Sequence, residues 1–269
     1  YQKKKDKYII DLFCGCGGFA EGFERSGYKS YLSADFDYWA CETFKSRFKK
    51  SKVINEDITS DKFKAILKKQ TKGVKIEGVV AGLPCQSFSS VGRAQDKFSM
   101  AKDKRNYFYK DFFECLKIIK PNFFVFENVR GILSAKPNGV KIFDNILELS
   151  KKLGYVTLDD TSKMVFDTSE YGVPQTRKRV FVIGVKKKYS KLIPKIYEDL
   201  INVQKDKNKY TVKDAISDLP PLKPGEGTDK VKLIKKNKNS YLKKIANSKF
   251  VFNHVARNHN ERDRQRYKF

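Results

Sequence analysis

Short apolar runs alternate with longer amphipathic stretches along the first 185 residues of the chain. The apolar runs read as strands and lie at residues 8–13, 30–34, 53–54, 78–81, 123–126 and 180–185. Apolar positions with helical spacing occupy the stretches between them, at residues 18–26, 38–48, 61–70, 107–119 and 140–153. This alternation predicts βαβ units, and therefore an α/β fold with a mainly parallel sheet covered by helices on both faces.

The pattern weakens towards the end of the chain. Residues 186–209 are charged and weakly periodic, and residues 210–219 predict one short helix. Prolines and a glycine then break the chain between residues 220 and 225. We therefore expect two domains, residues 1–190 and residues 191–269.

Charge distinguishes these two parts. The 269-residue chain has 57 Lys and Arg against 31 Asp and Glu, a net charge of +26. Residues 186–269 hold 23 of the cations and 9 of the acids, a net +14. Such an excess is typical of proteins that bind a polyanion. A general richness in lysine explains part of the same excess.

Composition excludes several classes of protein. Hydrophobic residues make up 40% of the chain and aromatic residues 13%, which indicates a folded protein. No apolar run approaches the roughly 20 residues of a membrane span, and residues 1–5 are not followed by a hydrophobic stretch of the signal-peptide type. Five irregularly spaced cysteines without a CxxC motif, and only two histidines, predict neither a disulfide framework nor a zinc site. We therefore expect a cytoplasmic protein in a reducing compartment.

A glycine-rich turn follows the first predicted strand, with the sequence Cys14-Gly15-Cys16-Gly17-Gly18. Glycines let the backbone approach a ligand closely and leave the next helix N-terminus available for binding. The turn lacks the Gly-Lys-Ser/Thr of a phosphate-binding loop. Taken alone, it is equally explained as a tight strand-to-helix connection.

Acidic residues follow the next two predicted strands. Asp35 comes after the second strand and Asp57 after the third. A carboxylate after the second strand of a nucleotide-binding sheet commonly accepts hydrogen bonds from ribose hydroxyls. Each acid by itself also fits a solvated loop. The glycine turn has no phosphate-binding residues, and S-adenosylmethionine has no phosphates. Together with this turn, the two acids therefore favour S-adenosylmethionine over NAD or ATP as the ligand.

A thiol and a carboxyl group follow the fourth and fifth strands. Cys85 comes directly after Pro84, which restricts the backbone, and Glu127 follows the strand 123–126. A single Cys is more often a small buried hydrophobic residue than a nucleophile. Placed with Glu127 at one sheet edge over a cofactor site, Cys85 is better explained as a nucleophile.

These residues, in this order, make the sequence similar to the cytosine-C5 DNA methyltransferase family, over roughly residues 8–185. The segment 11–18 resembles the cofactor loop of that family, and residues 82–89 resemble its Pro-Cys-Gln loop. Residues 127–129 resemble its Glu-Asn-Val element, and residues 175–179 its Gln-x-Arg-x-Arg element. The resemblance implies a Rossmann-like methyltransferase domain followed by the start of a smaller target-recognition region.

The resemblance also implies ligands and the residues that bind them. The cofactor is S-adenosylmethionine, and the residues expected to bind it are Phe13, Gly15, Cys16, Gly17, Gly18, Asp35, Phe36, Asp57, Ile58 and Pro84. The macromolecular partner is double-stranded DNA, and the residues expected to contact it are Gln86, Ser89, Arg93, Lys97 and Arg105. Several of these lie in a polar segment, residues 90–105, that closes on DNA in the family. No metal is implied.

The implied reaction is DNA (cytosine-5-)-methyltransfer in a bacterial restriction-modification system. Cys85 adds as a thiolate to C6 of a flipped-out cytosine, which activates C5 for attack on the cofactor methyl group. Glu127 hydrogen-bonds the base at N3 and the exocyclic amine. Arg179 and Arg177 face O2 of the base or the DNA backbone, and Asn128 holds the loop.

One departure from the family keeps two other functions open. Family members carry a Gly-Asn-x-Val segment after target recognition, and nothing similar precedes Phe269. We therefore expect either a truncated chain or a split enzyme whose second polypeptide supplies the missing element. A tRNA cytosine-5 methyltransferase is one alternative, because one branch of the family uses the same Cys and Glu on RNA. A non-catalytic DNA-binding subunit is the other.

Overall fold

A computed structural model of the chain describes residues 6–84, 104–203, 209–234, 239–245 and 248–266. It divides into two compact units, which are described separately. Unit 1 comprises Tyr1–Phe166 and Lys178–Val203, and unit 2 comprises Asp167–Arg177 and Gln204–Phe269. The predicted domain boundary after residue 190 therefore falls inside unit 1.

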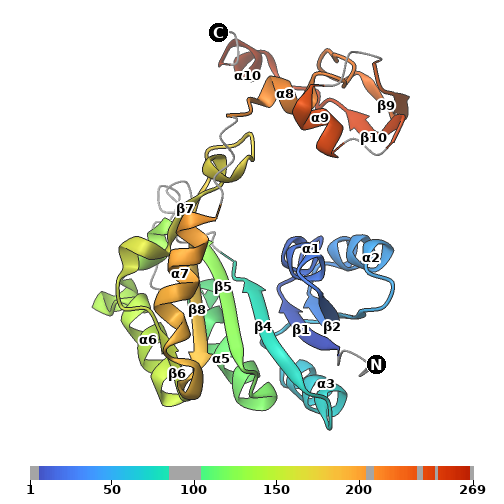
Figure 1. The fold of residues 1–269 in the computed structure, drawn as a ribbon. Coiled ribbons are helices and arrows are strands. Elements are labelled where there is room, and N and C mark those ends of the chain that lie inside the picture. Colours follow the sequence, from blue (N-terminus) through green and yellow to red (C-terminus); the bar gives the residue numbers. More distant parts are fainter. Residues whose placement is uncertain (1–5, 85–103, 204–208, 235–238, 246–247, 267–269) are drawn as a thin grey trace, which may run out of the picture. The chain divides into compact units, whose positions relative to one another are not determined.

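The sheet of unit 1 has the strand order β3-β2-β1-β4-β5-β8-β6, with β7 also paired to β8 (Figure 1). The first five strands in this order run parallel to their neighbours, and β8 runs antiparallel to β5 and β6. The strands are β1 (Lys7–Leu12), β2 (Tyr28–Asp35), β3 (Lys52–Asn55), β4 (Ile76–Gly82), β5 (Phe123–Val129), β6 (Tyr155–Thr157), β7 (Val165–Asp167) and β8 (Lys178–Lys186). The predicted α/β fold with a mainly parallel sheet is confirmed.

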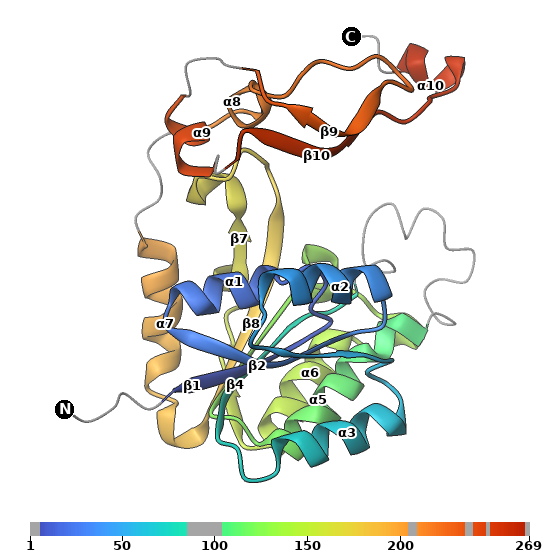
Figure 2. The same ribbon diagram turned by 90° about the vertical axis from the view of Figure 1, so that its right-hand side faces the viewer.

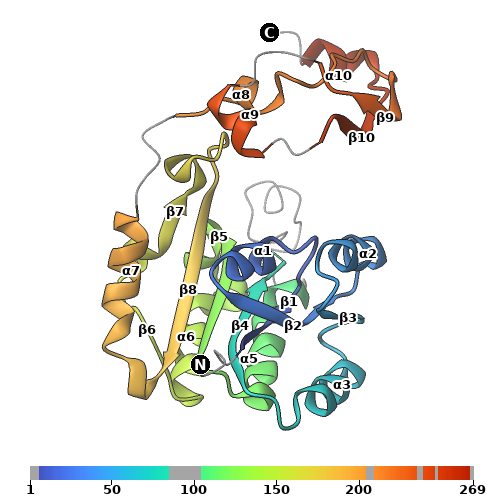
Figure 3. The ribbon, with the colours of Figure 1, turned by 45° about the vertical axis from the view of Figure 1, so that its right-hand side comes forward.

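Helices cover both faces of this sheet. Helices α3, α5 and α6 pack side by side on one face, and α1, α2 and α7 lie on the other (Figures 2 and 3). Their bounds are α1 (Gly18–Arg25), α2 (Tyr38–Arg47), α3 (Asp61–Thr71), α5 (Phe108–Ile119), α6 (Ile142–Lys152) and α7 (Leu192–Asn202). Short 3-10 segments are η1 (Lys104–Tyr107), η2 (Arg130–Leu133), η3 (Pro137–Gly139), η4 (Thr161–Met164), η5 (Thr168–Tyr171) and η6 (Lys187–Tyr189).

Aromatic packing attaches α5 to the sheet. Phe112 of α5 lies 5.7 Å from Phe124 and 5.8 Å from Phe126 of β5, ring centroid to centroid, in edge-to-face contacts. All three side chains are fully buried. Burial of such rings contributes most of the stabilisation of a core, so this contact holds β5 and its carboxyl end in place.

Helix α7 belongs to unit 1 because Tyr197 fastens it to β8. The Tyr197 hydroxyl accepts a hydrogen bond from the backbone amide of Ile183 at 3.0 Å and donates to the carbonyl of Phe181 at 2.9 Å. The interpretation of residues 186–209 as weakly periodic missed this helix, although Ile193, Ile196, Tyr197 and Leu200 follow a helical spacing. The contact to β8 explains why the chain stays in unit 1 as far as Val203.

Unit 2 contains short elements. They are α8 (Val212–Ile216), β9 (Gly227–Lys232), α9 (Ser240–Ile245), β10 (Phe250–Val255) and α10 (Glu261–Arg266). The helix predicted within residues 210–219 is α8, and it starts at a capping box in which Thr211 and Asp214 bond each other's backbone amides. Strands β9 and β10 pair antiparallel. Across the part of the chain that the structure describes, no helix combines the length and apolarity needed to span a membrane.

Candidate active site

The glycine-rich turn after β1 has a backbone that most residues would not adopt. Phe13, Gly15 and Gly17 all have positive φ angles, of 55°, 50° and 89°. A Cβ on Gly17 would lie 2.3 Å from the Phe48 ring, so glycine is required there. The amide of Gly17 donates to the carbonyl of Cys14 at 2.9 Å, and α1 begins at the next residue. The turn is therefore a compact loop that brings backbone close to the sheet edge.

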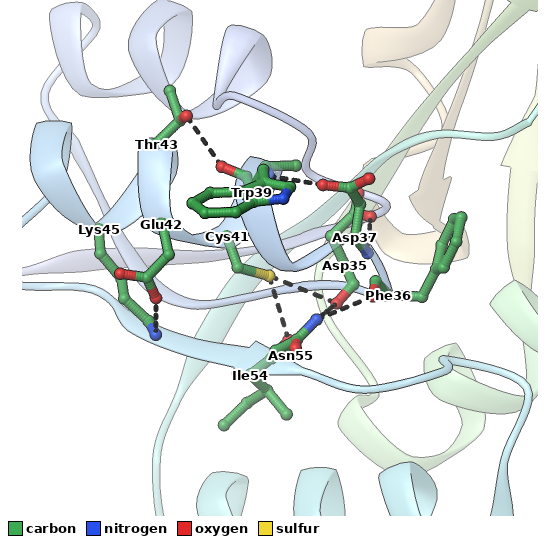
Figure 4. Close-up of polar contacts among 11 residues, drawn as sticks. Asp35, Phe36, Asp37, Trp39, Cys41, Glu42, Thr43, Lys45, Ile54 and Asn55 are labelled. Carbon is green, nitrogen blue, oxygen red and sulfur yellow. Dashed lines mark hydrogen bonds and ion pairs between the residues drawn. The ribbon is translucent and has the colours of Figure 1, made fainter.

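Asp35 holds this loop against the end of β2. One oxygen of its carboxylate, Oδ2, accepts the amide of Gly15 at 2.9 Å, and Oδ1 accepts the amide of Asp37 at 3.0 Å. The side chain of Asn55, from the end of β3, donates to the carbonyls of Asp35 and Phe36 at 3.1 and 2.9 Å (Figure 4). The structure thus brings Asp35 together with the glycine loop. Asn55, which the sequence analysis did not single out, positions the loop after β2.

The remaining residues predicted to bind the cofactor lie along the same edge. Phe36 is 73% exposed and Trp39, at the start of α2, is 75% exposed, so two large aromatic faces flank Asp35 (Figure 4). Asp57 accepts hydrogen bonds from the Thr59 amide and hydroxyl, both at 2.9 Å. Ile58 is buried. The segments after β2 and β3 are adjacent, because the amide of Glu56 donates to the carbonyl of Asp35 at 3.1 Å.

Asp11 is a buried acid that the sequence analysis did not place among the site residues. It is 1% exposed, and its Oδ2 accepts the amide of Ala20 at 3.2 Å. Its other oxygen, Oδ1, is buried and has no hydrogen-bond partner among the described residues. Burial raises the pKa of Asp11 well above its ordinary value, and the charge of Asp35 raises it further. The sequence feature that could have identified Asp11 as a site residue is its position as an acid in β1, next to the apolar residues Ile9, Ile10 and Leu12.

Replacing Asp11 with asparagine should change how stability depends on pH. The folded protein binds the Asp11 proton more tightly than the unfolded chain does. The contribution of this proton to the unfolding free energy is therefore fully present below pH 3.8 and decreases as pH rises above that value. Asp11→Asn does not titrate. As pH rises above 3.8, the unfolding free energy of the Asp11→Asn variant should therefore rise relative to the wild type, by up to about 1.4 kcal/mol per pH unit. Urea unfolding at several pH values measures this difference, and parallel curves would contradict the assignment.

The ends of β4 and β5 are adjacent and hydrogen-bonded. Gly82 of β4 pairs with Glu127 of β5 in parallel register. The buried amide of Asn128 donates to the carbonyl of Leu83 at 3.5 Å, and its Oδ1 accepts the amide of Val129 at 2.8 Å. Asn128 therefore fixes the chain immediately before Pro84. The predicted residues Cys85, Gln86, Ser89, Arg93 and Lys97 lie outside the described residues.

Glu127 and Arg179 form an ion pair across β5 and β8. Arg179 Nε lies 2.7 Å from Glu127 Oε1, and the two side chains are 16% and 21% exposed. The antiparallel register, with Val129 opposite Arg179, places the two residues on adjoining strands. A partly buried guanidinium gives a carboxylate a fixed direction as well as a compensating charge.

The other predicted arginines are placed differently. Arg177 belongs to unit 2, where its amide donates to Asp167 Oδ1 at 3.1 Å and its carbonyl accepts the amide of Thr168. Arg105 is exposed in η1. Among the residues the structure describes, no group of His, Cys, Asp and Glu could hold a metal ion.

The sequence matches one protein family over nearly its whole length. The profile described as C-5 cytosine-specific DNA methylase matches residues 8–268. The chain belongs to this family. The family predicted from the motifs is therefore confirmed.

Two curated members of the methylase family illustrate the similarity. The chain is 38% identical over 258 residues to the Type II methyltransferase M.DdeI of Desulfomicrobium norvegicum, which covers 94% of this chain and 58% of that protein. It is 31% identical to the Type II methyltransferase M.Bpa9945I of Bacillus paralicheniformis, covering 82% of this chain and 62% of that protein. The chain thus spans about three-fifths of the length of these relatives.

Solved structures show the same fold. A protein encoded in an Escherichia coli prophage and described as a DNA modification methyltransferase superposes with a TM-score of 0.65 at 28% identity. The match covers 89% of this chain and 64% of that one. Spodoptera frugiperda DNMT2 superposes with a TM-score of 0.51 at 20% identity over 67% of this chain and 50% of that one, which supports the fold alone.

Proposed function

We propose that the chain carries the catalytic machinery of a DNA (cytosine-5-)-methyltransferase of a restriction-modification system. The observation that carries the proposal is the Glu127–Arg179 ion pair at the sheet edge where β4 leads to Pro84 and Cys85. Glu127 pairs with Gly82, which comes two residues before Pro84. A carboxyl group with a fixed orientation at this position can bind the cytosine base while the thiolate adds to it.

Cys85 supplies the nucleophile in this reaction. Its thiolate forms a bond to C6 of the cytosine, and the electron pair of the C5–C6 double bond moves to make C5 nucleophilic. C5 then takes the methyl group, and the donor sulfonium is left as a neutral thioether. A base removes the proton on C5, the electron pair re-forms the C5–C6 double bond, and the C6–S bond breaks to return the thiolate. The ring is unreachable inside a duplex, so the target cytosine must leave the base stack.

Glu127 and Arg179 hold the cytosine in this scheme. The carboxyl group of Glu127 hydrogen-bonds N3 and the exocyclic amine, which favours the protonated ring and so eases addition at C6. Arg179 orients Glu127 through its Nε–Oε1 contact and faces O2 of the base. Asn128 acts on the chain before Cys85 through Leu83, so its role is that of a positioning residue.

The residues along the cofactor edge fit S-adenosylmethionine, which supplies a methyl group activated by a sulfonium charge. The loop 13–18 contains no Lys or Arg to grip phosphates. A ligand that carries cationic ammonium and sulfonium groups would favour the ionised form of Asp11 against the burial that raises its pKa, and would give the buried Oδ1 a partner. Asp35, Phe36 and Asp57 would hold the adenosine, with the loop backbone and Pro84 nearby.

Removing the Asp35 carboxylate should weaken cofactor binding. Asp35→Ala loses the hydrogen bond from the Gly15 amide, which holds the glycine loop, and the one from the Asp37 amide, which holds the turn after β2. We expect the affinity for S-adenosylmethionine to fall about 10- to 100-fold, the effect of losing one or two hydrogen bonds to a charged group. Trp39 is the only tryptophan in the chain and lies near Asp35, so quenching of its fluorescence measures binding.

The control for this prediction is Asp144→Ala. Asp144 is an exposed acid of α6 that pairs with Lys141 at 3.5 Å. Its loss should leave the quenching curve unchanged. Equal affinity of the Asp35→Ala variant and the wild type would show that Asp35 does not shape the cofactor site.

Methyl transfer tests the proposed function directly. The chain is incubated with S-adenosylmethionine carrying a tritiated methyl group, and with either duplex DNA or tRNA. Tritium at C5 of DNA cytosine supports the proposal, and label on tRNA alone would favour the RNA alternative. Label on neither substrate would reject the enzymatic function for this chain.

A further inference from the structure

Lys64 of α3 connects the segment after β3 to the neighbouring helix α5. Its ammonium donates to the carbonyl of Thr59 at 3.1 Å and to Asp111 Oδ1 at 3.0 Å. The side chains of Lys64 and Asp111 are each 24% exposed, so most of this ion pair is shielded from water. Shielding reduces screening by solvent and salt, so the pair restrains both side chains more firmly than an exposed pair would.

Thr59 lies in a turn that also carries Asp57, one of the residues expected to bind the cofactor. Asp57 Oδ1 accepts both the amide and the hydroxyl of Thr59 at 2.9 Å, and the carbonyl of Asp57 accepts the amide of Ser60 at 3.0 Å. We call residues 57–60 the Asp57 turn. The other carboxylate oxygen of the exposed Asp57, Oδ2, has no hydrogen-bond partner among the residues that the structure describes. A displacement of Thr59 would therefore move a carboxylate that is available to a ligand.

Helix α3 begins directly after the Asp57 turn and has its own cap. The Ser60 hydroxyl accepts the amide of Phe63 at 3.0 Å, and the amide of Lys64 donates to the carbonyl of Ser60 at 3.2 Å. This cap satisfies the start of the helix without the Lys64 side chain. The hydrogen bond from the Lys64 ammonium to Thr59 therefore acts as an additional restraint on the position of the Asp57 turn.

Asp111 fixes the direction of the Lys64 ammonium from the first turn of α5. Burial lowers the pKa of Lys64, but the hydrogen bond and negative charge of Asp111 are the main opposing effects, and the pKa lies above its ordinary value. Phe108, the first residue of α5, stacks on Phe13 of the glycine turn, with ring centroids 5.8 Å apart and ring planes 20° apart. The first turn of α5 thus contacts the glycine turn directly and the Asp57 turn through Lys64.

We propose that Lys64 is a positioning residue for S-adenosylmethionine, because it holds the Asp57 turn where the Asp57 carboxylate meets the adenosine. Lys64 acts through the carbonyl of Thr59 and makes no contact with the cofactor itself. Asp111 keeps the ammonium directed at that carbonyl. This inference rests on the proposed function, which supplies S-adenosylmethionine as the methyl donor.

The test compares two variants that lose the same ion pair. Lys64→Met keeps the length of the side chain but loses the contacts to both Thr59 and Asp111. Asp111→Asn loses the ion pair and leaves the hydrogen bond from Lys64 to Thr59. Lys64→Arg is the conservative variant, and Lys68→Met, which changes an exposed lysine one turn further along α3, is the matched control. Circular dichroism and thermal melting confirm that each variant folds.

We expect Lys64→Met to weaken binding of S-adenosylmethionine about 3- to 10-fold in calorimetry, the effect of losing one hydrogen bond. The KM for the cofactor should rise by the same factor, while kcat at saturating cofactor changes less than about 2-fold. Lys64→Arg should recover most of the affinity. Asp111→Asn and Lys68→Met keep the contact to Thr59 and should lose less than about 2-fold in affinity.

Two outcomes of this comparison would overturn the proposal. If Asp111→Asn weakens cofactor binding as much as Lys64→Met does, packing of α3 on α5 is responsible and not the contact to Thr59. If Lys64→Met binds the cofactor with the affinity of the wild type, the contact to Thr59 does not position the Asp57 turn.

A double-mutant cycle shows whether Lys64 acts through Asp57. Asp57→Ala removes the carboxylate that Lys64 is proposed to position. In that background, Lys64→Met should therefore cost less than about 2-fold in cofactor affinity, because the two substitutions disrupt the same contact. Equal losses in the wild-type and Asp57→Ala backgrounds would mean that Lys64 acts independently of Asp57, and would reject the proposed role.

The proposed function fails separately from this inference. If the wild type binds S-adenosylmethionine but transfers no methyl group, the methyltransferase proposal is wrong, and the affinities of the Lys64 variants still decide the role of Lys64. If the wild type methylates DNA and Lys64→Met binds the cofactor with unchanged affinity, the role of Lys64 alone is wrong. A wild type that does not bind S-adenosylmethionine would reject both.

Discussion

Replacing Cys85 with alanine is expected to reduce methyl transfer to DNA by about 10⁴-fold or more, the scale of losing a covalent nucleophile. No other group in the proposed scheme can form the bond to C6 that activates C5. Binding of S-adenosylmethionine, followed by Trp39 fluorescence, should be preserved, because cofactor affinity does not depend on the thiolate. The effect should therefore fall on the chemical step alone.

A mechanism-based inhibitor makes this prediction sharper. DNA that contains 5-fluorocytosine cannot lose the C5 substituent, so the C6–S bond should persist and trap a protein–DNA adduct. The wild type should form this adduct in the presence of cofactor, and Cys85→Ala should not. Adduct formation or methyl transfer by the alanine variant would show that another residue is the nucleophile.

Cys115→Ala is the matched control for loss of a thiol. Cys115 lies in α5 and is fully buried in the core. Burial raises the pKa of its thiol to about 12, so it carries no thiolate at neutral pH and is unsuited to nucleophilic attack. The Cys115→Ala variant should still form the trapped adduct.

Glu127→Gln is expected to lower kcat by about 10²- to 10⁴-fold, the usual contribution of a general acid or base. Glutamine keeps the size of the side chain but cannot give a proton to N3, and it removes the negative charge that faces Arg179. Addition of the thiolate should slow as well, so the adduct with 5-fluorocytosine DNA should form more slowly. Single-turnover methyl transfer and the rate of adduct formation measure both effects.

Two further variants separate charge from position at this pair. Arg179→Lys keeps the charge but loses the planar guanidinium that orients Glu127, and should cost less than Glu127→Gln. Glu148→Gln breaks an exposed pair with Lys152 at 2.6 Å and should leave kcat unchanged. A decrease in kcat of less than tenfold for Glu127→Gln would mean that Glu127 does not bind the cytosine base during the reaction.

The family and the fold class could be predicted from the sequence, since both depend on local patterns. The glycine turn and the Pro-Cys-Gln sequence each follow a strand whose apolar run is clear, and the Glu-Asn-Val sequence, predicted to follow its strand, forms the last three residues of β5. Helix α7 has a helical pattern of apolar residues that the sequence interpretation missed, whereas its attachment to the backbone of β8 through Tyr197 is a contact between separate elements that no local pattern shows. The reversed direction of β8 depends on the same kind of long-range pairing.

The partners of the site residues were decided by tertiary structure. Asp35 is an acid after a strand in the sequence, but only the fold shows that it binds the amide of Gly15, twenty residues away. Arg177 and Arg179 look equivalent in the sequence. The fold distinguishes them, because β8 begins at Lys178 and includes Arg179, which pairs with Glu127 of β5, whereas Arg177 precedes the strand.

The sequence by itself determined which chemical groups stand at the strand ends, because strand periodicity and turn residues are encoded by neighbours along the chain. Only the tertiary structure decided which groups act together. It left one oxygen of Asp11 buried without a partner, paired Glu127 with Arg179, and placed the Lys64 ammonium against Asp111. Each of these depends on distances between residues far apart in sequence. Strand pairing and burial determine those distances, and local sequence patterns do not.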